Sequence, residues 1–225
     1  MSINQEKYIK IISELKGNVM LVAVSKTKTA KDIEELYDLG QRDFGENYVQ
    51  ELVDKYETLP KDIHWHFIGH LQTNKVKFIA PFVSFIHGVD SFRLLKEINK
   101  QGEKSNRIIN CLLQIHIAQE ETKFGLNEDE LDEITDSTEL KDLKNIKICG
   151  MMGMASFTEN VETIRNEFRY LKTLYHSYNK LSIANCQLLI LSMGMSADYK
   201  IAIEEGSNMV RIGSLIFGDR TTIKK

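Results

Sequence analysis

The segment 21-LVAVSKTKTAKDIEELYDLGQRDFG-45 contains a complete strand–helix–strand unit. Apolar residues at 19–25 predict a buried strand, and a shorter apolar run at 42–44 predicts a second strand. Between them, Thr29 suits the N-cap of a helix, and Gly40 suits its C-terminal end. The apolar residues of that helix are Ile33, Leu36 and Tyr37. A helix between two buried strands is typical of parallel pairing, because the chain must cross back before the next strand begins.

The same alternation of apolar runs and helical patterns continues along the whole chain. Strands are expected at 19–25, 42–44, 64–68, 83–87, 108–116, 146–151, 187–191 and 208–212. Eight parallel strands joined by helices close a (β/α)8 barrel, and a chain of 225 residues suits one such domain. We therefore expect an α/β fold, a single TIM-type barrel domain over residues 1–225. An open doubly wound sheet is the alternative, although no GxGxxG follows the first strand.

Further patterns outside the strands predict helices. The N-terminal sequence MSINQEKYIKIISELKGN is amphipathic and predicts an additional helix before the barrel. Thr158 is expected to open a long helix, and Ser196 is expected to cap a helix that ends at Gly206. The polar stretch 118–142 predicts a loop and a surface helix.

Composition limits the classes of function. The net charge of −3 gives no general attraction to nucleic acid or to an anionic membrane. No stretch has the apolar core of a signal peptide or approaches a membrane span, so a cytoplasmic protein is expected. The cysteines are Cys111, Cys149 and Cys186, and each lies in or beside an apolar run. Because they form no CxxC or Cys/His metal spacing, we expect buried, reduced thiols. We also expect a monomer, since no long apolar face is left over.

In a barrel of this type the functional site lies at the C-terminal ends of the strands, and the loops after strands seven and eight often hold a phosphate. Those two loops contain the sequences LSMGMS and RIGS. Their serine hydroxyls and N–H groups would suit an anion, and a glycine lets the backbone approach a ligand closely. The candidates are Ser192, Ser196, Gly213 and Ser214. Serine and glycine are also common in ordinary turns, so either loop alone fits both interpretations.

Arg211 lies near the end of the eighth predicted strand. Strand alternation places it on one face with Met209, and Val210 and Ile212 on the other. A guanidinium in a central strand is costly to bury without a partner. That partner is either a carboxylate of the protein, in a structural ion pair, or a polar atom of a ligand.

Lys26 stands at the mouth of the first predicted strand, which neighbours the eighth strand in a closed barrel. An amine that is partly desolvated and close to another cation has a lowered pKa, so its neutral form can attack a carbonyl. Pyridoxal 5′-phosphate (PLP) fits this set, with its aldehyde at Lys26, its phosphate at the last two loops and its ring nitrogen toward Arg211. A plain surface charge is the alternative for Lys26. Lys28 is expected to face solvent.

Other polar residues at strand ends are less informative. Asn47, in the sequence FGEN, is expected to line the mouth of the pocket, although a cap or turn role is the alternative. His64, His66 and His70 lie close together in HWHFIGH, but no acidic ligand stands at a suitable spacing, so no metal site is expected. The methionines of GMMGM and SMGM would make adaptable pocket walls or ordinary core.

Longer segments carry a resemblance to a known family. They are AVSKTK, GQRDFGENYVQE, WHFIGHLQTNK, TKFGL, ICGMMGMAS and LSMGMSADYKIAIEEGSNMVRIGSLIFGDR, which together run from about Leu21 to Arg220. These segments resemble the pyridoxal phosphate homeostasis proteins, whose fold is that of the alanine racemase N-terminal barrel. Thr29, where many members have proline, and His70 depart from the family pattern.

The resemblance implies roles for individual residues. It makes Lys26 the Schiff-base lysine and Arg211 the partner of the pyridine nitrogen, and it places Asn47 along the site. The implied phosphate contacts are Ser192, Gly213 and Ser214.

The resemblance also implies a function: binding PLP and buffering or delivering it, with apo PLP-dependent enzymes as candidate partners and no substrate turnover. An arginine at the ring nitrogen disfavours its protonation, and an unprotonated ring is a weaker electron sink. Racemases also need a tyrosine from a further β domain, which is not expected in a chain that ends five residues after Arg220. The alternatives are a PLP enzyme with weak amino-acid racemase or lyase activity, and a phosphosugar aldolase that uses Lys26 without a cofactor.

Overall fold

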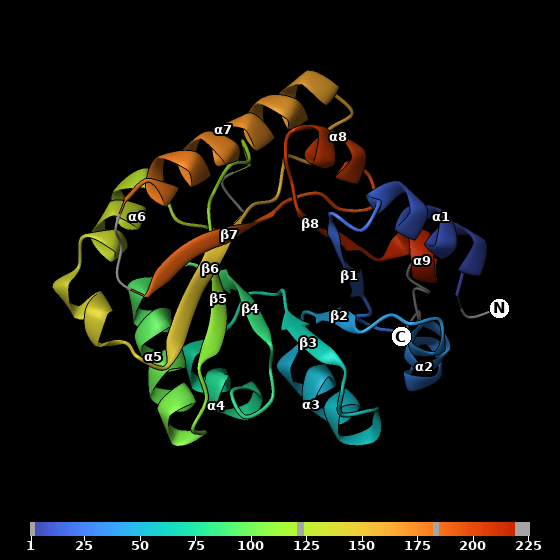
Figure 1. Cartoon of the computed structure of the whole chain (residues 1–225), viewed down its shortest axis with the longest axis horizontal. Helices are drawn as coiled ribbons and strands as arrows, with labels where there is room; N and C mark the ends of the chain where they lie inside the picture. Colours follow the sequence, from blue (N-terminus) through green and yellow to red (C-terminus); the bar gives the residue numbers. More distant parts are fainter. Residues whose placement is uncertain (1–2, 121–123, 182–184, 219–225) are drawn as a thin grey trace.

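The computed structural model describes residues 3–120, 124–181 and 185–218. Its strands are β1 (Met20–Val24), β2 (Asp43–Glu46), β3 (His64–Phe67), β4 (Phe85–Val89), β5 (Ile109–Gln114), β6 (Ile146–Met152), β7 (Cys186–Ser192) and β8 (Met209–Ile212). Each strand pairs in parallel with the next, and β8 pairs with β1, which closes the barrel (Figure 1). The predicted (β/α)8 barrel is confirmed, each predicted strand is present within a few residues, and the open sheet is excluded.

Helices surround the barrel (Figure 1). They are α1 (Gln5–Leu15), α2 (Ala30–Asp38), α3 (Val49–Thr58), α4 (Val76–Ile79), α5 (Phe92–Lys104), α6 (Glu128–Thr135), α7 (Val161–Asn179), α8 (Tyr199–Glu204) and α9 (Ser214–Phe217), with short 3₁₀ turns η1 (Thr73–Lys75) and η2 (Thr138–Asp142). The predicted additional N-terminal helix is α1. It packs beside α9, and the N–H of Asn4 donates to the carbonyl of Ile216 at 2.7 Å.

Of the N-cap residues predicted for α2 and α7, the first is confirmed and the second is wrong. Thr29 caps α2 as predicted, because its hydroxyl and the carboxylate of Asp32 form a reciprocal capping box. Thr158 was expected to open the next long helix, but α7 begins only at Val161. Its cap is Asn160, whose side-chain oxygen accepts N–H groups of the first turn. Thr158 and Asn160 are both suitable N-cap residues, and Asn160 is the one that begins α7.

Ser196 is not the cap of α8, which corrects the prediction. The residue before that helix is Asp198, whose carboxylate accepts the N–H of Met195 at 2.6 Å. The hydroxyl of Ser196 instead accepts the N–H of Gly213 at 3.3 Å. Ser196 therefore joins the loop after β7 to the loop after β8.

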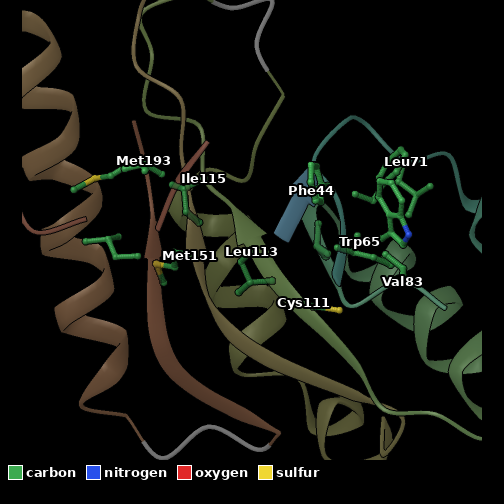
Figure 2. Close-up of a cluster of buried hydrophobic side chains, with 14 of the residues drawn as sticks. Phe44, Trp65, Leu71, Val83, Cys111, Leu113, Ile115, Met151 and Met193 are labelled. Atoms are coloured by element: carbon green, nitrogen blue, oxygen red, sulfur yellow. The ribbon is translucent and has the colours of Figure 1, made fainter. Parts of the chain in front are cut away.

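The two faces of the strands build separate apolar layers. The larger layer lies between barrel and helices, where Phe44, Trp65, Leu71 and Val83 gather in one part of it (Figure 2). The smaller layer fills the barrel and consists of Val22, Leu112, Cys149, Met152 and Met209. Inward-facing side chains therefore close the barrel as a packed core and leave its C-terminal end for a site.

The polar stretch 118–142 forms a loop, α6 and η2, as predicted, with residues 121–123 outside the described ranges. The cysteines are free thiols; Cys111 and Cys149 are buried, and Cys186 is partly exposed. Within residues 3–120, 124–181 and 185–218, no helix combines the length and the apolar character that crossing a membrane requires.

Candidate functional site

A cavity of about 640 Å³ lies at the C-terminal end of the barrel. Most of the residues predicted for the site are on its wall, and they come from β1, β2, β8 and the segments that follow them. They are Lys26, Asn47, Arg211, Gly213 and Ser214. The segments after β3, β6 and β7 complete the wall. The rule that places barrel sites at the strand ends therefore located this cavity from the sequence.

Lys26 reaches the cavity because it continues the inner face of β1. Val22 belongs to the cluster inside the barrel, and Val24 and Lys26 line the cavity, so every second residue points inward. The strand ends at Val24, and the chain then turns through Thr27, whose φ of 64° is in the left-handed region. Few non-glycine residues adopt this conformation, and it is found disproportionately at functional sites.

Lys28 does not face solvent, which corrects the prediction. It is half-buried and lines the same cavity as Lys26. Its Nζ donates to the carbonyl of Phe217 at 2.9 Å and to that of Gly218 at 3.3 Å. This contact ties the segment after β1 to the end of α9, almost at the other end of the described chain.

Arg211 is buried, and oxygen atoms of two neighbouring strand ends hold it. Its Nη1 donates to the hydroxyl of Ser192 at 2.6 Å and to the Ser192 carbonyl at 3.0 Å, and its Nη2 donates to the carbonyl of Gly153 at 3.0 Å. Burial lowers the pKa of Arg211 to about 10, although the nearby carboxylate of Asp198 acts in the opposite direction. The guanidinium is therefore a cation at neutral pH, fixed in direction at the cavity wall.

Ser192 is fully buried beside this guanidinium and is not among the residues on the cavity wall. Its hydroxyl oxygen accepts a hydrogen bond from Arg211. Among the serines considered for the anion loops, Ser196 and Ser214 are on the wall.

The loops after β7 and β8 bring backbone donors to the cavity. The N–H groups of Ser196 and Ala197 have no acceptor within the described part of the chain. Ser214 is the first residue of α9, so its N–H has no partner inside that helix. A Cβ atom at Gly213 would lie only 3.0 Å from the carbonyl oxygen of Val24, so glycine allows β8 to approach β1 here. These N–H and O–H groups form a set that suits an anion.

Asn47 contributes an unsatisfied polar atom. Its Oδ1 is buried and has no hydrogen-bond partner among the residues that the structure describes. Gly69 packs so closely on the Asn47 backbone that any Cβ there would overlap the Asn47 carbonyl oxygen. A buried oxygen without a donor is costly, so the position favours a ligand that supplies one.

The histidine segment forms a hydrogen-bonded chain inside the barrel. His66 Nδ1 lies 2.8 Å from His87 Nε2, and His66 Nε2 lies 3.0 Å from Asp43 Oδ1. Burial, together with the neighbouring His66 and the cation of Arg211, holds the pKa of His87 well below its usual value. The described residues contain no group of three or more His, Cys, Asp or Glu side chains placed to hold a metal ion.

Apolar residues complete the cavity wall. Met154 and Met195, from the methionine segments of the sequence, line it, together with Ile68 and Ile164. Phe157 also lines it although this residue is 96% exposed. Sequence reasoning did not identify Phe157, because an aromatic residue in a polar loop carries no periodic signal.

Comparison with known proteins agrees with this geometry. The family described as "Alanine racemase, N-terminal domain" matches residues 5–221. The chain belongs to this family. It is 42% identical over 201 residues to the pyridoxal phosphate homeostasis protein of Aquifex aeolicus, covering 89% of this chain and 86% of that protein. It is 40% identical over 216 residues to the protein of the same name from Synechocystis, covering 95% of this chain and 97% of the relative.

A solved structure extends the likeness to three dimensions. PipY of Synechococcus elongatus PCC7942, solved with PLP bound, superposes with a TM-score of 0.86 and 31% sequence identity, covering 95% of this chain and 99% of PipY. These matches confirm the resemblance predicted from the sequence.

Proposed function

We propose that this chain binds PLP in the cavity at the C-terminal end of its barrel and acts in PLP homeostasis, holding and releasing the cofactor without substrate turnover. The observation that carries the proposal is the composition of one cavity wall. Lys26 comes from the segment that follows β1, and N–H and O–H donors come from the loops after β7 and β8. A small molecule with both an aldehyde and a phosphate suits this wall, because the aldehyde can react with the amine and the phosphate can accept from the donors.

The residues present fit PLP. Lys26 would hold the cofactor by its aldehyde, through the reversible covalent chemistry that an amine and an aldehyde undergo. Ser196, Ala197 and Ser214 supply donors for the phosphate. A hydroxyl group of the ligand would supply the donor that the buried Oδ1 of Asn47 needs.

Arg211 supports a holding role over a catalytic one. Its guanidinium stays charged at neutral pH, and a cation at the ring nitrogen disfavours protonation of that nitrogen. The ring is then a weaker sink for electrons. Ser192 contributes by fixing Arg211, and Gly213 contributes by bringing the last strand against β1.

Release implies acceptors, and apo PLP-dependent enzymes are the partners that we propose. We also propose a cytoplasmic monomer.

The cavity wall includes the exposed residue Phe157, so part of the site meets solvent directly. This opening supports the proposed exchange of the cofactor.

An absorbance titration tests the binding. Apo-protein mixed with PLP should develop the band of the lysine-bound cofactor, and Lys26→Ala should abolish it. Lys31→Ala, a change at an exposed residue of α2, is the matched control and should behave as wild type. A wild-type protein that takes up no PLP, or a band that survives in Lys26→Ala, would contradict the proposed site.

A transfer experiment tests the role. The loaded protein is incubated with an apo-enzyme acceptor and, separately, with a panel of amino acids. Transfer without amino-acid turnover is expected. Steady multiple turnover of any amino acid would establish the alternative, a PLP-dependent racemase or lyase.

A further inference from the structure

A buried network of ionisable side chains lies behind the Lys26 turn, where the segment after β1 and the end of β2 meet α3. The Glu46 side chain is fully buried, that of Lys55 is 8% exposed, and that of Glu51 is 23% exposed. Lys55 Nζ lies 2.7 Å from Glu46 Oε1 and 2.7 Å from Glu51 Oε1. Well-packed apolar residues are often as stable as a buried ion pair, so the network calls for a reason beyond stability.

The network holds both residues that flank Lys26. The hydroxyl of Ser25 donates to Glu46 Oε1 at 2.6 Å, and Lys55 Nζ donates to the carbonyl of Ser25 at 2.8 Å. The N–H of Thr27 donates to Glu51 Oε1 at 2.6 Å. Lys26 is therefore the central residue of a three-residue segment that is fixed at both ends.

Thr27 needs such support. Its φ of 64° is rare for a β-branched residue, and a conformation of this kind persists only where surrounding contacts enforce it. The bond from its N–H to Glu51 is one of those contacts. Because side chains alternate along the chain, holding Ser25 on the outer side of β1 directs Lys26 to the inner side.

We propose that Glu46, Glu51 and Lys55 are positioning residues for Lys26, which together fix the turn that presents its amine to the cavity. None of them is on the cavity wall, so they act through Ser25 and Thr27. The inference rests on the proposed function, in which Lys26 receives the aldehyde of PLP.

The rate of cofactor attachment tests the inference. Apo-protein is mixed with PLP, and the rise of the lysine-bound absorbance band is followed in time. Glu51→Ala removes the acceptor for the Thr27 N–H and should slow the rise on the order of tenfold or more, since small misplacements of a reacting group cost rate steeply. Glu51→Gln keeps an acceptor oxygen and should restore most of the rate.

Lys55→Met tests the other side of the network. It keeps the aliphatic stem but removes the bonds to Ser25 and to both carboxylates, so it should slow attachment at least as much as Glu51→Ala. Should this variant fail to fold, the pair Glu51→Ala and Glu51→Gln carries the test alone, because Glu51 is only partly buried.

A destabilised variant separates positioning from a general structural role. Leu95 is fully buried in α5, which packs against β5 and β6, and Leu95→Ala should lower resistance to urea without slowing attachment. Equal rates in wild type, Glu51→Ala and Lys55→Met would overturn the inference. Equal slowing in Leu95→Ala would overturn it as well. Failure of the wild-type protein to form a Lys26-dependent band would overturn the proposed function instead.

Discussion

Arg211 is bound twice to Ser192, by one hydrogen bond to the hydroxyl at 2.6 Å and by another to the carbonyl at 3.0 Å. The two residues belong to β8 and β7, which pair in register at Ser192 and Met209. A side-chain contact thus adds to the backbone pairing between these strands. It also fixes the direction of the one guanidinium that the described cavity wall contains.

Ser192→Ala should reduce stability more than it reduces PLP affinity. Removing the hydroxyl leaves a buried charged donor with one acceptor fewer, which costs about 1.5–3 kcal/mol of unfolding free energy. Ser214→Ala should do the reverse, because Ser214 is on the cavity wall and is exposed. Its loss should weaken PLP binding by about tenfold with little change in stability. Urea unfolding and equilibrium PLP binding measure the two quantities, and the same ratio of effects in both variants would contradict the assignment.

Gly150→Ala should destabilise the barrel strongly. A Cβ atom there would overlap the carbonyl oxygen of Ile190 on β7, and both strand pairings of β6 change register near this point. Backbone cannot move aside as a flexible side chain can, so we expect a loss of about 3 kcal/mol in urea unfolding. Gly40→Ala is the control. Apart from Gly40 and its two chain neighbours, no atom of the described residues lies within 4 Å of the place that its new Cβ would take, so its positive φ alone should cost about 1 kcal/mol. Equal losses in the two variants would refute the packing argument.

Stability should fall as the pH falls below about 6.5, in part because of His87. Burial holds the pKa of this histidine well below the value it has in the unfolded chain, so unfolding takes up a proton. The stabilisation is complete above the unfolded pKa and is lost toward the folded pKa, at up to about 1.4 kcal/mol per pH unit. His87→Gln should show a shallower decline, since glutamine can still hydrogen-bond His66 but does not titrate. Unfolding free energies of both proteins across mildly acidic pH give the comparison, and parallel curves would exclude His87 as the source.

The thiols should be unreactive in the folded protein. Burial raises the pKa of Cys186 to about 11 and also raises the pKa of Cys111 and of Cys149. Only the thiolate is a strong nucleophile, so iodoacetamide at about pH 8 should label the native protein far more slowly than the unfolded protein. Mass spectrometry of each cysteine peptide measures the labelling. Any cysteine that reacts equally fast in both states would contradict the prediction for that residue.

The barrel was predictable because its signals are local. Each strand is a short apolar run, and each crossover has helical spacing, so the count alone indicates closure. The start of α7 was not predictable in detail, because Thr158 and Asn160 are both good N-cap residues and stand only two positions apart.

The location of the site was predictable from the sequence, but most of the hydrogen bonds that its residues make were not. The strand-end rule located Lys26, Asn47 and Arg211 on one wall. The partners of these and neighbouring residues depend on distant parts of the chain. Lys28 meets carbonyls 189 and 190 residues away, and Lys55 meets Ser25 across 30 residues. From sequence alone Lys28 and Lys55 resemble solvated charges, since their periodicity does not reveal what covers them.

The position of Trp65 has a practical consequence. It is the single tryptophan of the chain, it is fully buried beside Phe44 between the barrel and the helices, and it is not on the cavity wall (Figure 2). Its ultraviolet emission therefore originates in one layer of the molecule and reports the integrity of that layer. Cofactor attached at Lys26 would absorb at longer wavelength and report a different place. Tryptophan emission and cofactor absorbance, recorded on one sample, can thus distinguish a protein that has lost its ligand from a protein that has unfolded.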